Sequence, residues 1–215
     1  MFNTIKSVIF DIGGVLVDLY PERCIEAFKA IGYPQAEEMI GRYCPSKILQ
    51  RVESGEMSGR ELVEYIHKDS GNESITYEDV RDAYIAFLGT IPIKKLRAIK
   101  SLRDAGIKTY ALSNINEFVM PHLRKELFTA DGLSTEEYFH YTYLSYEMGA
   151  LKPDRRIFQM MIDHSGMKPE ESLFIDDSPA NIESAREMGF QVYLAAPEED
   201  FTPLLKEIEE CCAKS

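Results

Sequence analysis

Short apolar runs separated by helical patterns recur along this chain, and this alternation constrains the fold more than any other feature. The runs are rich in β-branched and aromatic residues and cover 7–10, 107–112, 141–144, 172–175 and 191–195. Several are continuously apolar, as is typical of strands buried on both faces. Between them, apolar residues recur with helical spacing at 94–105, 155–165 and 182–188. Strand–helix–strand units of this kind predict an α/β protein with a doubly wound, Rossmann-like parallel sheet.

A long interval without a strand pattern separates the first two runs. It holds four amphipathic helical patterns, at 21–32, 37–55, 58–68 and 76–88. Ser58 and Thr76 stand at N-cap positions, and each is followed three residues later by an acid, as in a capping box. An insert of roughly seventy residues is the size of a small domain. We therefore expect an α/β core formed by residues 1–17 and 89–215, and a helical domain formed by residues 18–88.

The charge and the apolar runs narrow the possible partners. The chain carries 36 acidic and 24 basic residues, a formal net charge of −12. Nucleic acids are bound through lysine and arginine, so this balance opposes such a partner but leaves room for a small phosphorylated ligand. No apolar run has the length needed to cross a bilayer, and the first residues lack the pattern of a signal peptide. The four cysteines form no metal-binding or disulfide pattern, so we expect reduced thiols in a cytoplasmic protein, by default a monomer.

Polar residues follow the predicted strands where each strand ends. Asp11 comes after the first strand, Ser113 and Asn114 after the second, and Asp176 and Asp177 after the fourth. A further polar residue, Lys152, stands just before a predicted helix. Ligands of open α/β sheets bind beyond the carboxyl ends of the strands. These side chains are therefore expected to meet at one edge of the sheet.

Such a group of side chains can support phosphoryl transfer. Asp11 and Asp176 would form an oxygen-rich site suited to Mg²⁺, which offsets their repulsion and polarises a bound phosphate. Lys152 adds a positive charge that keeps Asp11 ionised, and Ser113 and Asn114 can donate hydrogen bonds to phosphoryl oxygens. An ionised Asp11 could then attack phosphorus and form an aspartyl-phosphate, which water hydrolyses.

Four motifs, in order along the chain, resemble those of the haloacid dehalogenase (HAD) superfamily of Mg²⁺-dependent phosphotransferases. They are FDIGGV at 10–15, LSN at 112–114, LKPD at 151–154 and FIDDSPANIESA at 174–185. Within the superfamily the chain looks most similar to the small sugar-phosphatase branch that includes α-D-glucose-1-phosphate phosphatase. The resemblance implies that the helical insert is the α-helical cap of that family.

The resemblance also implies roles for individual residues. Asp11 matches the nucleophile and a metal ligand, and Lys152 matches the lysine of the active site. Gly13 matches the residue whose backbone carbonyl binds the metal, and Asp176 matches the acidic metal ligand. The other matches are Ser113 in phosphate binding, Asp177 as the second acid, and Asn114 and Asn181 in supporting positions.

One departure from the family pattern concerns proton transfer. Phosphatases of this family usually carry a second aspartate two residues after the nucleophile, as general acid and base, and this chain has Gly13 there. General acid–base catalysis is worth about 10²–10⁴ in rate. The turn Glu53–Glu56, between two predicted cap helices, is one candidate source of the proton.

The leading hypothesis is a Mg²⁺-dependent phosphatase of a small phosphorylated metabolite, with a sugar phosphate as the expected substrate. A metal-independent 2-haloacid dehalogenase is one alternative, although adjacent Asp176 and Asp177 would then lack a cation. A non-catalytic regulator that binds a phosphometabolite is the other, because Gly13 replaces the usual acid.

Overall fold

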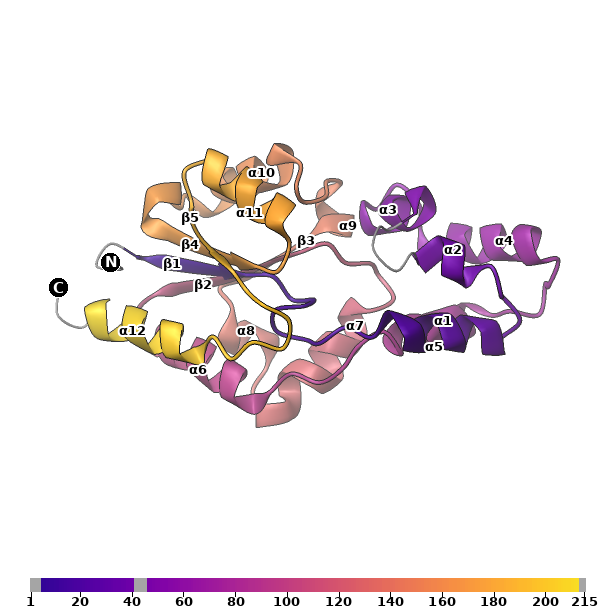
Figure 1. Cartoon of the computed structure of the whole chain (residues 1–215), viewed down its shortest axis with the longest axis horizontal. Coiled ribbons are helices and arrows are strands. Elements are labelled where there is room, and N and C mark those ends of the chain that lie inside the picture. Colours follow the sequence, from indigo (N-terminus) through magenta and orange to yellow (C-terminus); the bar gives the residue numbers. More distant parts are fainter. Residues whose placement is uncertain (1–4, 41–45, 213–215) are drawn as a thin grey trace.

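A five-stranded parallel sheet forms the centre of the larger part of the molecule (Figure 1). The structure, a computed structural model, describes residues 5–40 and 46–212. The strand order is β3-β2-β1-β4-β5. The strands are β1 (Ser7–Phe10), β2 (Lys108–Ser113), β3 (Tyr141–Leu144), β4 (Ser172–Asp176) and β5 (Gln191–Leu194). All five predicted strands are confirmed within one or two residues, and so is the parallel α/β class.

Two layers of helices bury the two faces of the sheet. Alternate residues of β1 belong to two different apolar clusters: Ile9 to one, and Val8 and Phe10 to the other. The first cluster includes Phe158 and other residues of α10 (Arg155–Ser165) and α11 (Pro179–Glu187). The second includes residues of α6 (Ile93–Asp104) and α12 (Thr202–Cys212), which lie on the opposite side of the sheet in Figure 1. This arrangement explains why β1 and β4 read as continuously apolar and makes the sheet doubly wound.

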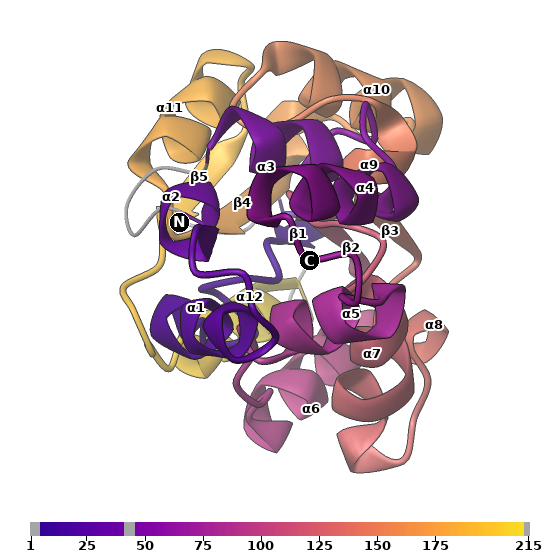
Figure 2. The same cartoon turned by 90° about the vertical axis from the view of Figure 1, so that its right-hand side faces the viewer.

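The helical insert lies beyond the carboxyl ends of the strands (Figures 1 and 2). Its helices are α1 (Pro21–Ala30), α2 (Ala36–Ile40), α3 (Lys47–Glu53), α4 (Gly59–Ser70) and α5 (Tyr77–Ile85). Both predicted capping boxes are present, Ser58 with Glu61 and Thr76 with Asp79. The chain leaves and re-enters the core side by side, because Tyr20 N donates to Phe87 O (2.7 Å) and Gly89 N donates to Asp18 O (2.8 Å). We call residues 21–85 the helical region.

The single helix expected over 37–55 is wrong. The structure has two helices there, α2 and α3, and residues 41–45 between them lie outside the described residues. Ser46 starts α3 as its N-cap, because its hydroxyl accepts a hydrogen bond from Leu49 N at 3.2 Å. A capped start of this kind begins a new helix rather than continuing an old one.

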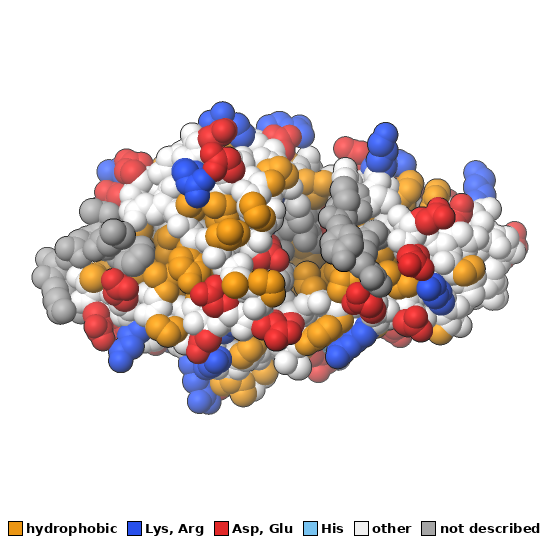
Figure 3. Space-filling view, viewed as in Figure 1, with side chains coloured by type: hydrophobic (Ala, Val, Ile, Leu, Met, Phe, Trp, Pro, Cys, Tyr) orange, Lys and Arg blue, Asp and Glu red, His pale blue; other side chains and the backbone are white. Residues whose placement is uncertain are grey.

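Short helical segments between the strands complete the core. They are α7 (Met120–His122), the π-helix η1 (Leu123–Leu127), the 3₁₀ helices η2 (Phe128–Asp131) and η3 (Pro169–Glu171), α8 (Thr135–Tyr138) and α9 (Ser145–Met148). Among the described residues, no helix is both long and apolar enough to cross a membrane. Among the described residues, Cys24, Cys211 and Cys212 form no disulfide, and Cys44 lies outside these residues. Figure 3 shows acidic side chains scattered over one face of the molecule rather than gathered in one patch.

Candidate active site

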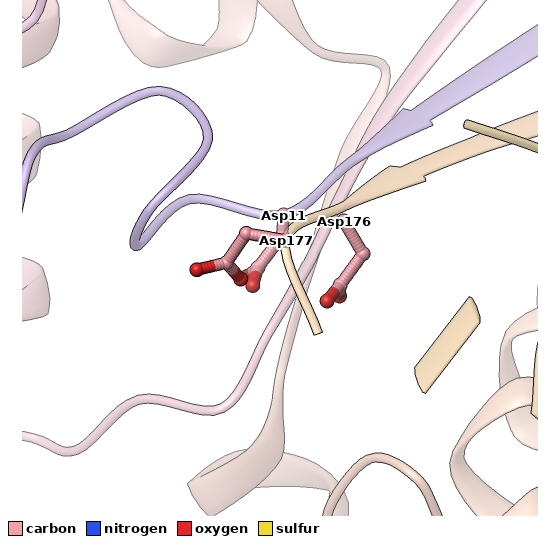
Figure 4. A group of neighbouring side chains, drawn as sticks. All are labelled: Asp11, Asp176 and Asp177. Carbon is pink, nitrogen blue, oxygen red and sulfur yellow. The ribbon is translucent and has the colours of Figure 1, made fainter. Parts of the chain in front are cut away.

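Three carboxylates meet at the carboxyl edge of the sheet. Asp11 follows β1, Asp176 ends the neighbouring strand β4, and Asp177 is the next residue. One carboxylate oxygen from each lies within 4.8 Å of the others, and Figure 4 shows all three beyond the ends of the two strands. The convergence of Asp11 and Asp176 predicted from the strand ends is therefore observed. We call Asp11, Lys152, Asp176 and Asp177 the strand-end cluster.

Lys152 joins two of the carboxylates. Its Nζ lies 2.9 Å from Asp11 Oδ1 and 2.7 Å from Asp176 Oδ2, and it also donates to Leu112 O at 2.9 Å. The side chains of Lys152 and Asp176 are 1% and 0% exposed, so these are charge-assisted contacts away from water. All three protons of the ammonium group have a partner. In this arrangement Lys152 compensates the carboxylates, and contact with a phosphate would require one of these bonds to exchange.

Two asparagines hold the charged groups in place. The Asn114 side chain accepts a hydrogen bond from Lys152 N (2.8 Å) and donates one to Lys152 O (2.9 Å). Asn181 donates to both oxygens of Asp176, at 2.9 and 3.1 Å. The geometry makes Asn181 a supporting residue of Asp176 and Asn114 a positioning residue of Lys152. The expected contact of Asn114 with a phosphate stays a prediction.

Asp11 presents one engaged oxygen and one available oxygen. Its Oδ1 accepts hydrogen bonds from Ile12 N (2.7 Å) and from Lys152. No hydrogen bond from the described residues reaches the other oxygen. Burial raises the pKa of Asp11 to about 7, Lys152 opposes this rise, and Asp176 adds to it. Asp11 is therefore held in a fixed orientation in which a cation would favour its ionised form.

The charge and ligand types of the cluster fit a hard divalent cation. Asp11, Asp176 and Asp177 carry three negative charges against the one positive charge of Lys152, a formal sum of −2. Burial, followed by the charge of Asp176, raises the pKa of Asp177 as well. Carboxylate oxygens grouped in this way are the ligands that Mg²⁺ prefers, and its charge would remove their repulsion. Asp177, expected only as a supporting acid, belongs to this group by position.

The loop after Asp11 makes room for the cluster. Gly14 has a φ of +76°, and a Cβ atom there would overlap the carboxylate of Asp177. Lys95, which is 2% exposed, donates from Nζ to Val15 O at 2.5 Å and so anchors the same loop from α6. Glycine is therefore required at this position.

A cavity of about 420 Å³ lies between the strand ends and the helical region. From the core it is lined by Gly13, Ser113, Asn114 and Asp177, among others. From the helical region it is lined by three apolar residues, Pro21, Ile40 and Leu49, and by Cys24, Glu53 and Tyr84. We call Cys24, Glu53 and Tyr84 the polar groups of the helical wall. An enclosed site with few polar groups is typical of small-molecule binding.

The sequence analysis missed one residue that connects the two parts. Ser145 directly follows β3, and its Oγ lies 2.6 Å from Glu53 O and 3.0 Å from Ile115 O, while it accepts from Ile115 N at 2.9 Å. This hydroxyl therefore links the end of α3 to the loop after β2. The rule that polar residues at strand ends belong to the site, applied to β3, would have found it.

Comparisons with known proteins agree with this geometry. A model of the haloacid dehalogenase-like hydrolases matches residues 5–189. The D-ribitol-5-phosphate phosphatase of Bacteroides thetaiotaomicron is 34% identical over 189 residues, which are 88% of this chain and 91% of that protein.

Solved structures are similar over nearly the whole chain. A HAD family enzyme from Bacteroides thetaiotaomicron, in complex with magnesium and inorganic phosphate, has a TM-score of 0.86 and 36% identity, and the match covers 93% of this chain and 98% of that one. A predicted HAD-like family hydrolase from Porphyromonas gingivalis has a TM-score of 0.87 and 38% identity, with 95% and 98% covered. Both cover the sheet and the helical region together.

Proposed function

The chain belongs to the haloacid dehalogenase-like hydrolases, and on this premise we propose that it hydrolyses a phosphate monoester of a sugar or sugar alcohol, with Asp11 as the nucleophile. Its similarity to a phosphatase over most of both chains makes it a phosphoric monoester hydrolase acting on a small phosphorylated metabolite. The observation that carries the finer proposal is that Asp11, Lys152 and Asp176 meet beside the cavity. Residues 18–88 are, in this proposal, the cap over that cavity.

The proposed chemistry begins at the available oxygen of Asp11. It attacks phosphorus in line with the leaving oxygen, and water then hydrolyses the aspartyl-phosphate. Asp11, Asp176 and the carbonyl of Gly13 would hold Mg²⁺, with Asp177 beside them, and the bound ion would offset the carboxylate charges and polarise the phosphate. Ser113, Asn114 and Lys152 would contact the phosphoryl oxygens. Lys152 favours the ionised form of Asp11, since its charge lowers the pKa of that carboxyl group, and the bound ion would add to this effect against burial.

The helical wall supports a hydroxylated substrate. Tyr84 is 4% exposed, and its hydroxyl has no hydrogen-bond partner among the described residues. Its ring is fixed by Phe118, stacked at 5.3 Å, and by Phe28, edge-on at 5.1 Å. A buried hydroxyl without a partner is costly, and the hydroxyl groups of a sugar or sugar alcohol would provide one.

Phosphate release tests the proposal directly. We expect release from sugar and sugar-alcohol phosphates, ribitol 5-phosphate among them, that requires Mg²⁺. Asp11→Asn keeps the size of the side chain but removes the nucleophile, so activity should fall about 10⁴-fold or more while the protein remains folded. Full activity in this variant would show that the nucleophile is another residue.

The same assay separates the alternatives. Chloride release from a 2-haloacid without Mg²⁺ would support a dehalogenase. Ligand binding without phosphate release, across the whole panel, would support a regulator. The formal charge of −2 in the strand-end cluster supports neither, because it calls for a cation.

A further inference from the structure

The leaving group sets a requirement that the strand-end cluster does not meet. The oxygen that departs from a sugar alcohol is a poor leaving group, so it needs a proton as its bond to phosphorus breaks. Gly13, two residues after Asp11, has no side chain to supply one. The proton must come from another group that lines the cavity.

Among the residues that the structure describes, four titratable side chains line the cavity: Cys24, Glu53, Tyr84 and Asp177. Asp177 belongs to the carboxylate group that fits a cation. Burial raises the pKa of the Cys24 thiol to about 12 and the pKa of Tyr84 well above its usual value, so neither group could release and recover a proton readily near pH 7. Glu53 is the remaining candidate.

Glu53 is held at the cavity by its backbone, which leaves its carboxyl group free to act. It is the last residue of α3, and its carbonyl oxygen accepts from Ser145 Oγ at 2.6 Å. Two residues later Gly55, with a φ of +73°, lies so close to the backbone of Tyr146 that no Cβ would fit. No hydrogen bond from the described residues reaches the Glu53 carboxyl group. The turn is therefore docked on the core, and Glu53 lines the cavity with no partner for its carboxyl group among the described residues.

We propose that Glu53 is the proton donor and acceptor of the reaction, an inference that rests on the proposed phosphatase function. As the Asp11 oxygen bonds to phosphorus and the bond to the leaving oxygen breaks, the Glu53 carboxyl group gives its proton to that oxygen, and an alcohol departs. Water then bonds to phosphorus, the bond to Asp11 breaks, and Glu53 takes a proton from the water. Each turnover returns Glu53 to its protonated form.

The charges around Glu53 agree with both halves of this cycle. Burial, together with the negative charge of Asp11 and against the opposing charge of Lys152, raises the pKa of Glu53 to about 7. Tyr84 from α5, Cys24 from α1 and Asp177 after β4 line the same cavity. A carboxyl group that titrates near neutral pH can both donate and accept a proton there.

Glu56 provides a matched control three residues along the chain. It is exposed and lines a different cavity, together with Lys47, Arg51 and Arg156. It belongs to the same turn and carries the same functional group as Glu53. Glu56→Gln therefore measures the effect of removing a carboxylate from this turn without changing the proposed site.

The test compares two leaving groups in Glu53→Gln, Glu56→Gln and the unaltered enzyme. Ribitol 5-phosphate releases a poor leaving group, and 4-nitrophenyl phosphate releases one that needs no proton. We measure kcat/KM, which reports the steps up to formation of the aspartyl-phosphate. In Glu53→Gln it should fall about 10²–10⁴-fold for ribitol 5-phosphate and less than about 10-fold for 4-nitrophenyl phosphate. In Glu56→Gln neither value should change.

The pH profile provides a second readout. In the unaltered enzyme the ratio of the two kcat/KM values, ribitol 5-phosphate over 4-nitrophenyl phosphate, should fall as the pH rises past about 7, because Glu53 loses its proton. Taking the ratio cancels the ionisation of Asp11, and each kcat/KM value is first corrected for the ionisation of its own phosphate group. This fall should be absent in Glu53→Gln.

Equal losses on both substrates, or no loss on ribitol 5-phosphate, would overturn the assignment of Glu53. Asp11→Asn in the same assay keeps the two proposals apart. If Asp11→Asn is inactive and Glu53→Gln shows no leaving-group dependence, the phosphatase proposal stands and the proton donor is another group.

Discussion

The two sides of the cavity differ in how completely their polar groups are bonded. In the strand-end cluster the Lys152 ammonium has three partners. Asn114 makes two hydrogen bonds to the Lys152 backbone, and Asn181 makes two to Asp176. On the helical wall, the buried Tyr84 hydroxyl has no partner among the described residues. The Glu53 carboxyl group receives no hydrogen bond from them either. The strand-end cluster is thus held in place before a substrate binds, whereas the helical wall has polar groups that a substrate could still hydrogen-bond.

This difference follows from what each side has to do. Groups that act on phosphorus must be held in place before the reaction, since reorganisation would add to the barrier. A group that contacts the rest of the substrate adds to the affinity when it has no partner in the free protein and forms a hydrogen bond with the substrate. The comparison therefore predicts that removing a group from the cluster affects stability and activity together, whereas removing one from the wall affects activity alone.

The largest effect is expected for Lys152→Met, which removes the cation of the strand-end cluster. It leaves Asp11 and Asp176 buried without their cation, and breaking a buried pair costs about 3–5 kcal/mol. Activity should fall together with the free energy of unfolding. Urea unfolding without Mg²⁺ measures this loss.

The free energy of unfolding of Lys152→Met should decrease as the pH rises. The folded-state pKa of Asp11 already stands above its usual value of 3.8, at about 7, and without Lys152 it rises further. An acid with a raised folded-state pKa gives its full contribution to stability below its unfolded pKa and loses it as the pH rises through the folded value. Lys152→Met should therefore be less stable at pH 8 than at pH 5.

An exposed lysine provides the control for this prediction. Lys94 pairs with Asp200 at 2.9 Å, and its side chain is 57% exposed. Pairs at the surface contribute about 0–1 kcal/mol. Lys94→Met should thus cost less than about 1 kcal/mol, and a comparable loss in both variants would show that burial of the Lys152 pair is not what matters.

A smaller effect is expected for Asn114→Ala. This change removes the two hydrogen bonds that hold the backbone of Lys152, at 2.8 and 2.9 Å, and leaves the charges in place. We expect a loss of about 1–3 kcal/mol in unfolding free energy, from buried groups without partners. Since Lys152 would be less well placed, kcat should fall by more than KM rises, roughly 10- to 100-fold. An unchanged kcat would mean that Asn114 does not position Lys152.

The strand-end cluster could be predicted from the sequence because strand ends of a parallel sheet converge whatever the details of packing. Asp11 and Asp176 follow or end apolar runs that the structure pairs directly, with Phe10 beside Ile175. The same reasoning could have included Ser145 but was not applied to β3. The short segments from α7 to α8 were missed because helices of three to five residues show no helical period.

The helical wall could not be predicted in the same way. Glu53 and Glu56 stand in one turn with the same chemistry, and only the docking of that turn on Ser145 and Tyr146 distinguishes them. Tyr84 reads as a core residue of an amphipathic helix, and its ring does pack in the core. Whether its hydroxyl finds a partner depends on tertiary packing, which the spacing of apolar residues in the sequence does not predict.

The smallest effect is expected for Tyr84→Phe, which tests whether a polar group of the helical wall binds the substrate. Removing a buried hydroxyl that has no protein partner should leave the free energy of unfolding unchanged or slightly higher. If that hydroxyl binds the substrate, kcat/KM for ribitol 5-phosphate should fall by the worth of one hydrogen bond, about 0.5–1.5 kcal/mol or roughly 2- to 13-fold.

Tyr138 is the matched control, because its hydroxyl is also buried without a partner among the described residues but does not line the cavity. Tyr138→Phe should change stability as Tyr84→Phe does and leave kcat/KM unaltered. Equal kinetics in the two variants would mean that the Tyr84 hydroxyl is a packing defect, and that the helical wall reaches the substrate through Glu53 rather than through Tyr84.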